Sequence, residues 1–221
     1  MKRELLIAGN WKMNLNLKES LILAELVKKG TSKFKNIKVL VSPNFVSLVI
    51  VSHAVEDSSV LVAAQDCHFE SDGAYTGAIS AEMIKSAGAK WVIVGHSERR
   101  KLFGEDDAIV AKKLKNVLKN KLKAIVCIGE SLEEREAGIQ NDVIKRQLDH
   151  ILKAAHSLEN VVIAYEPVWA IGTGKTATPE QAEEMHKYIR DLIKNSAGVE
   201  ISESILICMA AVYLCRMQKS C

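Results

Sequence analysis

Several features of secreted, membrane and nucleic-acid-binding proteins are absent from this 221-residue sequence. Its five cysteines form no Cys-x-x-Cys pair, which argues against a zinc site or a disulfide framework. No segment approaches the roughly 20 apolar residues of a membrane-spanning helix, and the N-terminal apolar run is too short for a signal peptide. The net charge of +3 comes without a basic block. We therefore expect a cytoplasmic protein with no membrane partner and no nucleic-acid partner.

Common nucleotide-binding motifs are also missing from the glycine-containing stretch at residues 172–176. A P-loop requires a glycine at the position that Trp169 occupies. The dinucleotide pattern G-x-G-x-x-G fails because Ala177 stands where its third glycine is required. Neither kind of nucleotide site is therefore predicted.

What is present is the composition of a globular protein, with 48% hydrophobic and 26% charged residues. Short apolar runs typical of buried strands alternate with amphipathic helical segments, and no hairpin signal interrupts them. The predicted strands cover residues 5–8, 37–41, 60–64, 91–94, 124–128 and 161–165. The predicted helices cover approximately residues 17–29, 46–55, 80–87, 106–120, 132–152 and 179–195, the last capped by Thr178. This alternation predicts a parallel α/β fold.

Polar side chains follow the C-terminal ends of five of these strands. They are Asn10 and Lys12, Gln65 and Asp66, His96 and Glu98, Glu130, and Glu166. In a closed barrel such strand ends converge on one face, where active sites are built. An open doubly wound sheet would concentrate its site at one switch point instead. The distribution therefore favours a (β/α)8 barrel, with the whole chain as one domain.

The same face would combine an acid, an imidazole, an ammonium group and an amide from Glu166, His96, Lys12 and Asn10. No cysteine nucleophile with a base and no Ser-His-Asp arrangement is found. His96 and the acids could ligate a metal ion, but the other histidines lie elsewhere in the predicted fold. Each of these side chains alone is more often structural or solvated. Together they suit proton transfer beside a carbonyl, with Glu166 as the base and with His96 and Lys12 stabilising the oxyanion.

Three longer motifs make this sequence resemble the triosephosphate isomerase family. They are GNWKMN at residues 9–14, VGHSERR at 94–100 and AYEPVWAIGTG at 164–174, supported by AYTG at 74–77 and CIGE at 127–130. The resemblance covers about residues 2–206. It implies an enzyme of glycolysis and gluconeogenesis that interconverts dihydroxyacetone phosphate and glyceraldehyde 3-phosphate through an enediolate, without cofactor or metal.

The resemblance also implies a role for each residue of the site. Glu166 is similar to the family's base and His96 to its neutral electrophile, a pair already well characterised in this family. Lys12 and Asn10 are similar to the substrate-binding cation and amide. Glu98 is similar to the acid that positions Lys12.

Two loops have expected roles as well. Residues 169–175 mix bulky apolar residues with two glycines, which suits a closing lid or, taken alone, an ordinary strand-to-helix connection. By resemblance, Gly172 lies in the lid and its N–H binds the substrate phosphate. The loop Asp66 to Ala78 is similar to the arm through which family members form homodimers, with Thr76 reaching the neighbouring site. The alternative for this loop is a long mobile connection.

The family pattern ends at about Ile207. A seventh strand followed by Tyr-Gly-Gly-Ser and an eighth strand ending in Gly-Gly are expected next, and both supply phosphate-binding N–H groups. We therefore expect a family-like region over residues 1–207 and an aberrant tail over residues 208–221. The barrel is then C-terminally truncated, with strands one to six complete, the seventh partial and the eighth missing.

A shifted reading frame offers an explanation for the tail. Read from the last base of the Ile207 codon, the codons of the next six residues can spell Tyr-Gly-Gly-Ser-Val. Three of the five cysteines fall in the last fourteen residues, which agrees with out-of-frame translation. A frameshift predicts this motif in the DNA, whereas a divergent functional tail does not. Under the frameshift hypothesis the chain as written is an inactive or unstable truncated remnant of the enzyme.

Overall fold

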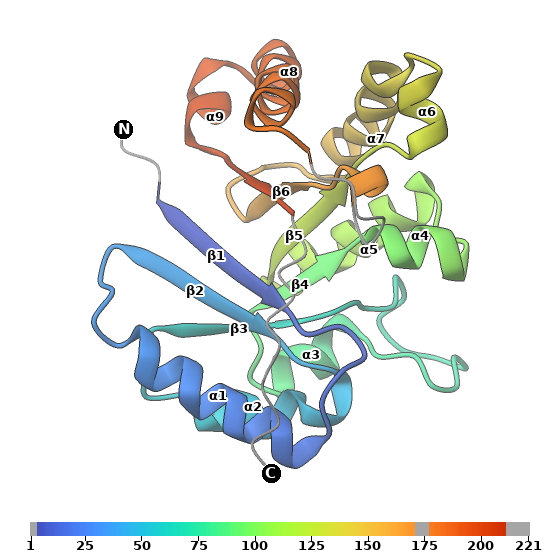
Figure 1. Ribbon diagram of the computed structural model, residues 1–221. Coiled ribbons are helices and arrows are strands. Elements are labelled where there is room, and N and C mark those ends of the chain that lie inside the picture. The colour runs from blue at the N-terminus through green and yellow to red at the C-terminus, as the bar shows by residue number, and fades with distance from the viewer. Residues whose placement is uncertain (1–3, 171–176, 211–221) are drawn as a thin grey trace.

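The computed structural model describes residues 4–170 and 177–210. Seven parallel strands form one sheet whose order follows the sequence, from β1 to β7. The sheet curls into a nearly closed barrel with helices around its outside (Figure 1). The strands are β1 Leu5–Asn10, β2 Ile37–Ser42, β3 Val60–Ala64, β4 Trp91–Val94, β5 Lys123–Ile128, β6 Val161–Tyr165 and β7 Leu206–Met209. The predicted barrel is confirmed, and no eighth strand lies among the described residues.

One or two α-helices follow each of the first six strands along the chain. They are α1 Leu17–Thr31, α2 Leu48–Ala54, α3 Ala81–Ser86, α4 Ser97–Phe103, α5 Asp107–Lys119, α6 Leu132–Glu136, α7 Gln140–Ala154, α8 Pro179–Ala197 and α9 Val199–Ser204, with short 3-10 turns η1 Phe45–Ser47 and η2 Val168–Ala170. Thr178 caps α8 as predicted, accepting a bond from the Gln181 N–H. The helical region predicted over 132–152 is confirmed and consists of two helices, α6 and α7, separated at Gly138, whose left-handed φ of 72° suits glycine.

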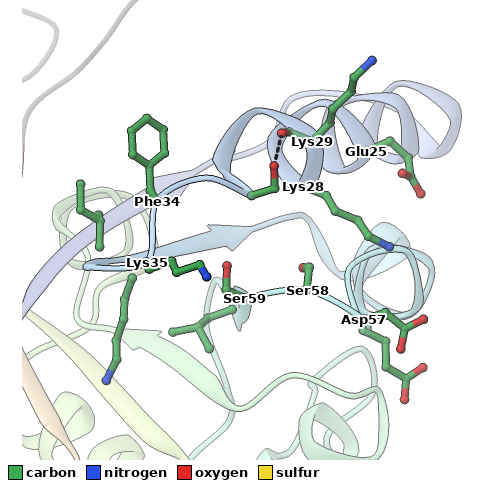
Figure 2. A pocket seen from close by; sticks show the side chains of 13 residues that line it. Glu25, Lys28, Lys29, Phe34, Lys35, Asp57, Ser58 and Ser59 are labelled. Atoms are coloured by element: carbon green, nitrogen blue, oxygen red, sulfur yellow. Dashed lines mark hydrogen bonds between the residues drawn. The ribbon is translucent and has the colours of Figure 1, made fainter.

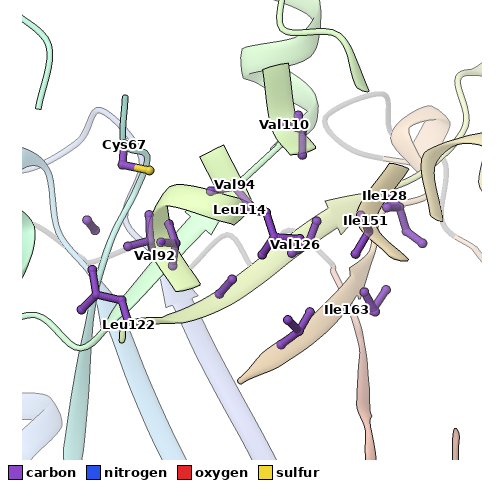
Figure 3. Packing of buried hydrophobic residues seen from close by; sticks show 14 of the residues in the cluster. Cys67, Val92, Val94, Val110, Leu114, Leu122, Val126, Ile128, Ile151 and Ile163 are labelled. Atoms are coloured by element: carbon purple, nitrogen blue, oxygen red, sulfur yellow. The ribbon is translucent and has the colours of Figure 1, made fainter. Parts of the chain in front are cut away.

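Strand side chains alternate between two apolar layers because successive residues point to opposite faces of a sheet. Val92, Val94 and Val126 point outward into an apolar cluster that also contains Leu114 of α5 and Ile151 of α7 (Figure 3). A second cluster contains only strand residues among its buried members and fills the barrel interior: Leu40, Ala63, Trp91, Ile93, Ile125, Cys127, Val162 and Ala164. The barrel is therefore a packed core, and chemistry is left to its rim.

The barrel wall ends at β1 and β7, which the described sheet does not join to each other. The apolar side chains of Leu5 and Ile7 are 61% and 59% exposed. Both sit on alternate positions of β1, and their interior neighbour Leu6 packs against the inner cluster. Leu5 and Ile7 therefore point outward, and an exposed apolar end strand of this kind favours association with other chains.

Asp66 does not join the rim as predicted and instead turns toward the outer helices. Its Oδ1 accepts a bond from Lys113 Nζ at 2.6 Å, and Lys113 also contacts Glu105 Oε1 at 2.5 Å. Arg99 Nε lies 2.9 Å from Asp66 Oδ2. Burial raises the pKa of the Asp66 carboxyl, and the charge of Lys113 opposes this rise. The four side chains form a largely buried ion cluster between β3 and α5.

Replacing Lys113 by alanine is expected to lower the free energy of unfolding by about 3–5 kcal/mol, because Asp66 and Glu105 would lose their shared buried cation. Urea denaturation at neutral pH measures this. Lys115→Ala removes an exposed lysine from the same helix and should cost no more than about 0.5 kcal/mol. Equal losses in the two variants would contradict a structural role for the cluster.

Candidate active site

Lys12 follows β1 in an unusual backbone conformation. Its φ is 53°, a left-handed value that is uncommon for a residue with a side chain. The Lys12 N–H donates to Asn10 Oδ1 at 2.9 Å, and its carbonyl accepts from Gln65 Nε2 at 2.8 Å. A strained backbone conformation of this kind persists only where the surrounding contacts hold it in place, and such residues cluster at functional sites.

The Lys12 ammonium reaches across the rim to α4. Its Nζ lies 2.6 Å from Glu98 Oε1, although the two residues are 86 positions apart. Both side chains remain partly exposed. The ammonium is therefore oriented by Glu98 and still open to an anionic ligand.

His96 occupies the N-cap position of α4. Its Nδ1 accepts a bond from the Glu98 N–H at 3.2 Å. A ring nitrogen that accepts carries no proton, so the imidazole is neutral and its proton sits on Nε2. That Nε2 lies 3.3 Å from Glu166 Oε1. The structure thus gives His96 one N–H directed at the rim.

Glu166 follows β6 and is only 2% exposed. Its Oε2 accepts a bond from the Ser97 N–H at 2.8 Å, while Oε1 faces His96. The buried thiol of Cys127 lies beside the same carboxylate. Burial, and next the charge of Glu166, raise the pKa of Cys127 well above its usual value, so this thiol stays neutral. Ser97 and Cys127 belong to the site, yet neither side chain marks itself as functional in the sequence.

Five of the predicted site residues therefore meet at one rim, linked in the order Asn10, Lys12, Glu98, His96 and Glu166. They come from the ends of β1, β4 and β6. The sixth predicted residue, Gly172, lies outside the described residues.

Glu130 lies near this rim but is engaged elsewhere. It is fully buried, and its Oε1 accepts from Tyr165 Oη at 3.0 Å, Trp169 Nε1 at 2.8 Å and Arg135 at 2.9 Å. Burial and the nearby charge of Glu130 raise the pKa of Tyr165, which keeps the phenol protonated as a donor. Glu130 therefore anchors the buried indole of Trp169, at the start of the predicted lid.

A hollow of about 990 Å³ lies away from this rim (Figure 2). It opens between the end of α1 and the N-terminal ends of β2 and β3, and its lining includes Lys28, Lys29, Lys35 and Asp57. None of the predicted site residues lines it. We assign the active site to the rim and not to this hollow, because active sites of barrels lie at the C-terminal ends of the strands.

Residues 4–170 and 177–210 contain neither a metal-ion cluster nor a membrane-spanning helix. No group of three or more His, Cys, Asp or Glu side chains is arranged to hold a metal ion. No helix combines the length and the apolar character required to cross a bilayer.

Comparison with known proteins gives a match over almost the whole chain. The family model described as triosephosphate isomerase matches residues 5–212. The chain belongs to the triosephosphate isomerase family.

Individual triosephosphate isomerases are similar over a comparable span. The protein from Alkaliphilus oremlandii is 50% identical over 207 residues, which is 93% of this chain and 83% of the relative. Those from Chloroherpeton thalassium and Chlorobium luteolum are 46% and 45% identical, each over 93% of this chain and 82% of the relative.

The family match extends into the predicted aberrant tail. Cys208 and Met209 lie in β7, where they pair with Ala164 and Tyr165 of β6. Residues 211–221 lie outside the described part of the chain. All five described residues of the rim fall within the matched triosephosphate isomerase region.

Proposed function

We propose that this chain interconverts dihydroxyacetone phosphate and D-glyceraldehyde 3-phosphate through an enediolate, as triosephosphate isomerase does, in glycolysis and gluconeogenesis. The observation that best supports this is the 3.3 Å contact between His96 Nε2 and Glu166 Oε1. It brings a base and a neutral proton donor together at one rim, beside the Lys12 ammonium. Family membership supports the same reaction.

In the first step Glu166 removes a proton from C1 of dihydroxyacetone phosphate. The C–H electron pair forms the C1=C2 bond, and the carbonyl pair moves onto O2. The Nε2–H of His96 donates to O2 as negative charge develops there. The Lys12 ammonium stabilises this charge together with that of the phosphate.

In the second step the protonated Glu166 returns its proton to C2. The hydroxyl proton on O1 passes to O2 through His96, and the carbonyl re-forms at C1. The reaction is a net shift of two hydrogens within one molecule, so it needs no external oxidant or reductant, and His96 and Lys12 supply the stabilisation of the oxyanion. In this scheme Glu98 orients Lys12, Asn10 supports the strained backbone of Lys12, and Gly172 binds the phosphate through its N–H.

Isotope exchange tests this mechanism directly. The purified chain is incubated with dihydroxyacetone phosphate in D2O and followed by proton NMR. Isomerisation through an enediolate is expected to introduce solvent deuterium into both triose phosphates, because Glu166 exchanges its proton with water. A folded chain that produces no glyceraldehyde 3-phosphate would overturn the proposal.

A second candidate is an inactive or unstable remnant of the same enzyme. The exposure of Leu5 and Ile7 on the outer face of β1 favours it. A circular-dichroism melt combined with the isomerase assay separates the candidates. Cooperative unfolding with normal turnover excludes the remnant, whereas a broad melt without turnover supports it.

We also propose that the chain forms a cytoplasmic homodimer through the loop Asp66 to Ala78. The loop projects from the barrel beyond α3, and residues 70–77 are all exposed (Figure 1). The rings of His68 and Tyr75 pack against each other within the loop in a tilted arrangement, with centroids 4.3 Å apart, so the loop is held by its own side chains. Sedimentation should give twice the 24.4 kDa chain mass, and Thr76→Arg should give monomers. A monomeric unsubstituted chain would contradict this proposal.

A further inference from the structure

We propose that Gln147, on α7, is a positioning residue that holds the base Glu166 in place through the backbone of Gly129. The inference rests on the isomerase function proposed above. Gln147 is 5% exposed and uses both ends of its amide on one residue. Its Oε1 accepts from the Gly129 N–H at 2.9 Å, and its Nε2 donates to the Gly129 carbonyl at 3.0 Å.

Gly129 lies directly against the backbone of Glu166. A Cβ atom built on Gly129 would lie 1.8 Å from the Glu166 carbonyl oxygen, so no side chain fits there. The flanking residues bind the same segment, because the Glu166 N–H donates to the Ile128 carbonyl at 2.7 Å and the Val168 N–H to the Glu130 carbonyl at 3.2 Å. The position of the Glu166 backbone is therefore set by the 128–130 segment.

Gln147 supplies the hydrogen-bond partners that a neighbouring strand would otherwise supply to the backbone of Gly129. β4 ends at Val94, which pairs with Val126, three residues before Gly129. Buried N–H and C=O groups need partners, and an amide side chain carries both N–H donors and a carbonyl acceptor. These two hydrogen bonds, called the Gln147 clasp below, fix the orientation of the two peptide groups that flank Gly129. Without them these peptide groups can turn, and a displacement of about 1 Å at a reacting group can cost about 100-fold in rate.

The first test replaces Gln147 by methionine, which has similar length and cannot form either bond. We expect kcat per folded molecule to fall by about 10- to 100-fold with KM unchanged, because neither Lys12 nor Asn10 contacts Gln147. Ile151→Val, on the same helix and without a bond to Gly129, is the matched control. It should lower the melting temperature and leave kcat unchanged. A wild-type kcat in folded Gln147→Met overturns the proposal.

A second variant, Gln147→Glu, adds a readout that a merely structural role would not move. A protonated carboxyl offers one donor and one acceptor and can keep the clasp, whereas the ionised form only accepts and repels the Gly129 carbonyl. We therefore expect kcat of this variant to fall as the pH rises through an ionisation that the wild type lacks. Parallel pH profiles of kcat for variant and wild type overturn the proposal.

Amide hydrogen exchange decides the same question without turnover. The Glu166 N–H should exchange faster in Gln147→Met than in the wild type and in Ile151→Val. If the wild-type chain introduces no deuterium into substrate, the isomerase proposal fails while this measurement still reports on positioning. Unchanged exchange at Glu166 overturns the positioning role.

Discussion

Replacing Glu166 by glutamine is expected to lower kcat by about 10²–10⁴-fold, because the amide cannot accept the carbon-bound proton. The substitution keeps the size of the side chain. Its carbonyl oxygen can still accept the Ser97 N–H bond, which measures 2.8 Å with the native carboxylate. The loss should therefore appear in kcat and in the rate of deuterium incorporation, with KM and the circular-dichroism spectrum nearly unchanged.

Glu183→Gln is the matched control for this variant, since Glu183 is an exposed residue of α8. It removes the same charge from the chain and should leave kcat at the wild-type value. Glu166→Asp tests position separately from chemistry, because it keeps the acid and withdraws it by one methylene. If Glu166→Gln turns over at the wild-type rate, another group is the base and the proposed mechanism is wrong.

Replacing His96 by alanine is expected to lower kcat by about 10²–10³-fold, the usual cost of removing one donor to a developing oxyanion. The neutral tautomer, fixed by the 3.2 Å bond from the Glu98 N–H to Nδ1, leaves Nε2–H as that donor. His96→Gln restores an N–H donor without the ability to relay a proton between O1 and O2. We therefore expect its kcat to lie between those of the wild type and His96→Ala.

Steady-state kinetics in both directions measures these rates, and His53→Ala is the control. His53 is an exposed residue of α2 and should tolerate the change without loss of kcat. A His96→Ala variant that keeps its fold and the wild-type kcat would show that the oxyanion is stabilised elsewhere. A loss confined to KM would assign His96 to substrate binding alone.

Local signals in the sequence were sufficient to predict most of the barrel. The six predicted strands are present, because each buried strand of a parallel sheet is a short apolar run bounded by polar residues. Thr178 and Pro179 start α8 because capping depends on residues within one turn. The motif containing His96 and Glu98 placed both residues at a strand end, which the structure confirms at the start of α4.

Other elements depended on weaker local signals. The helical region predicted over 132–152 divides into two helices at Gly138, because one left-handed glycine can end a helix within an otherwise helical pattern. The short helices α4 and α9 were not predicted, since six or seven residues carry little periodicity. Asp66 and Glu130 each follow a strand, yet both are bound by partners that the pattern does not specify.

The sequence by itself determined the fold class, the family and the residue types gathered at the rim, because hydrophobic periodicity and motif residues are properties of short segments. Tertiary structure decided which of those residues touch. The tautomer of His96, the contact between Lys12 and Glu98 and the clasp of Gln147 on Gly129 depend on helices and strands far apart in the chain. Such contacts are set by packing geometry to within an ångström, and side-chain patterning alone carries no information at that scale.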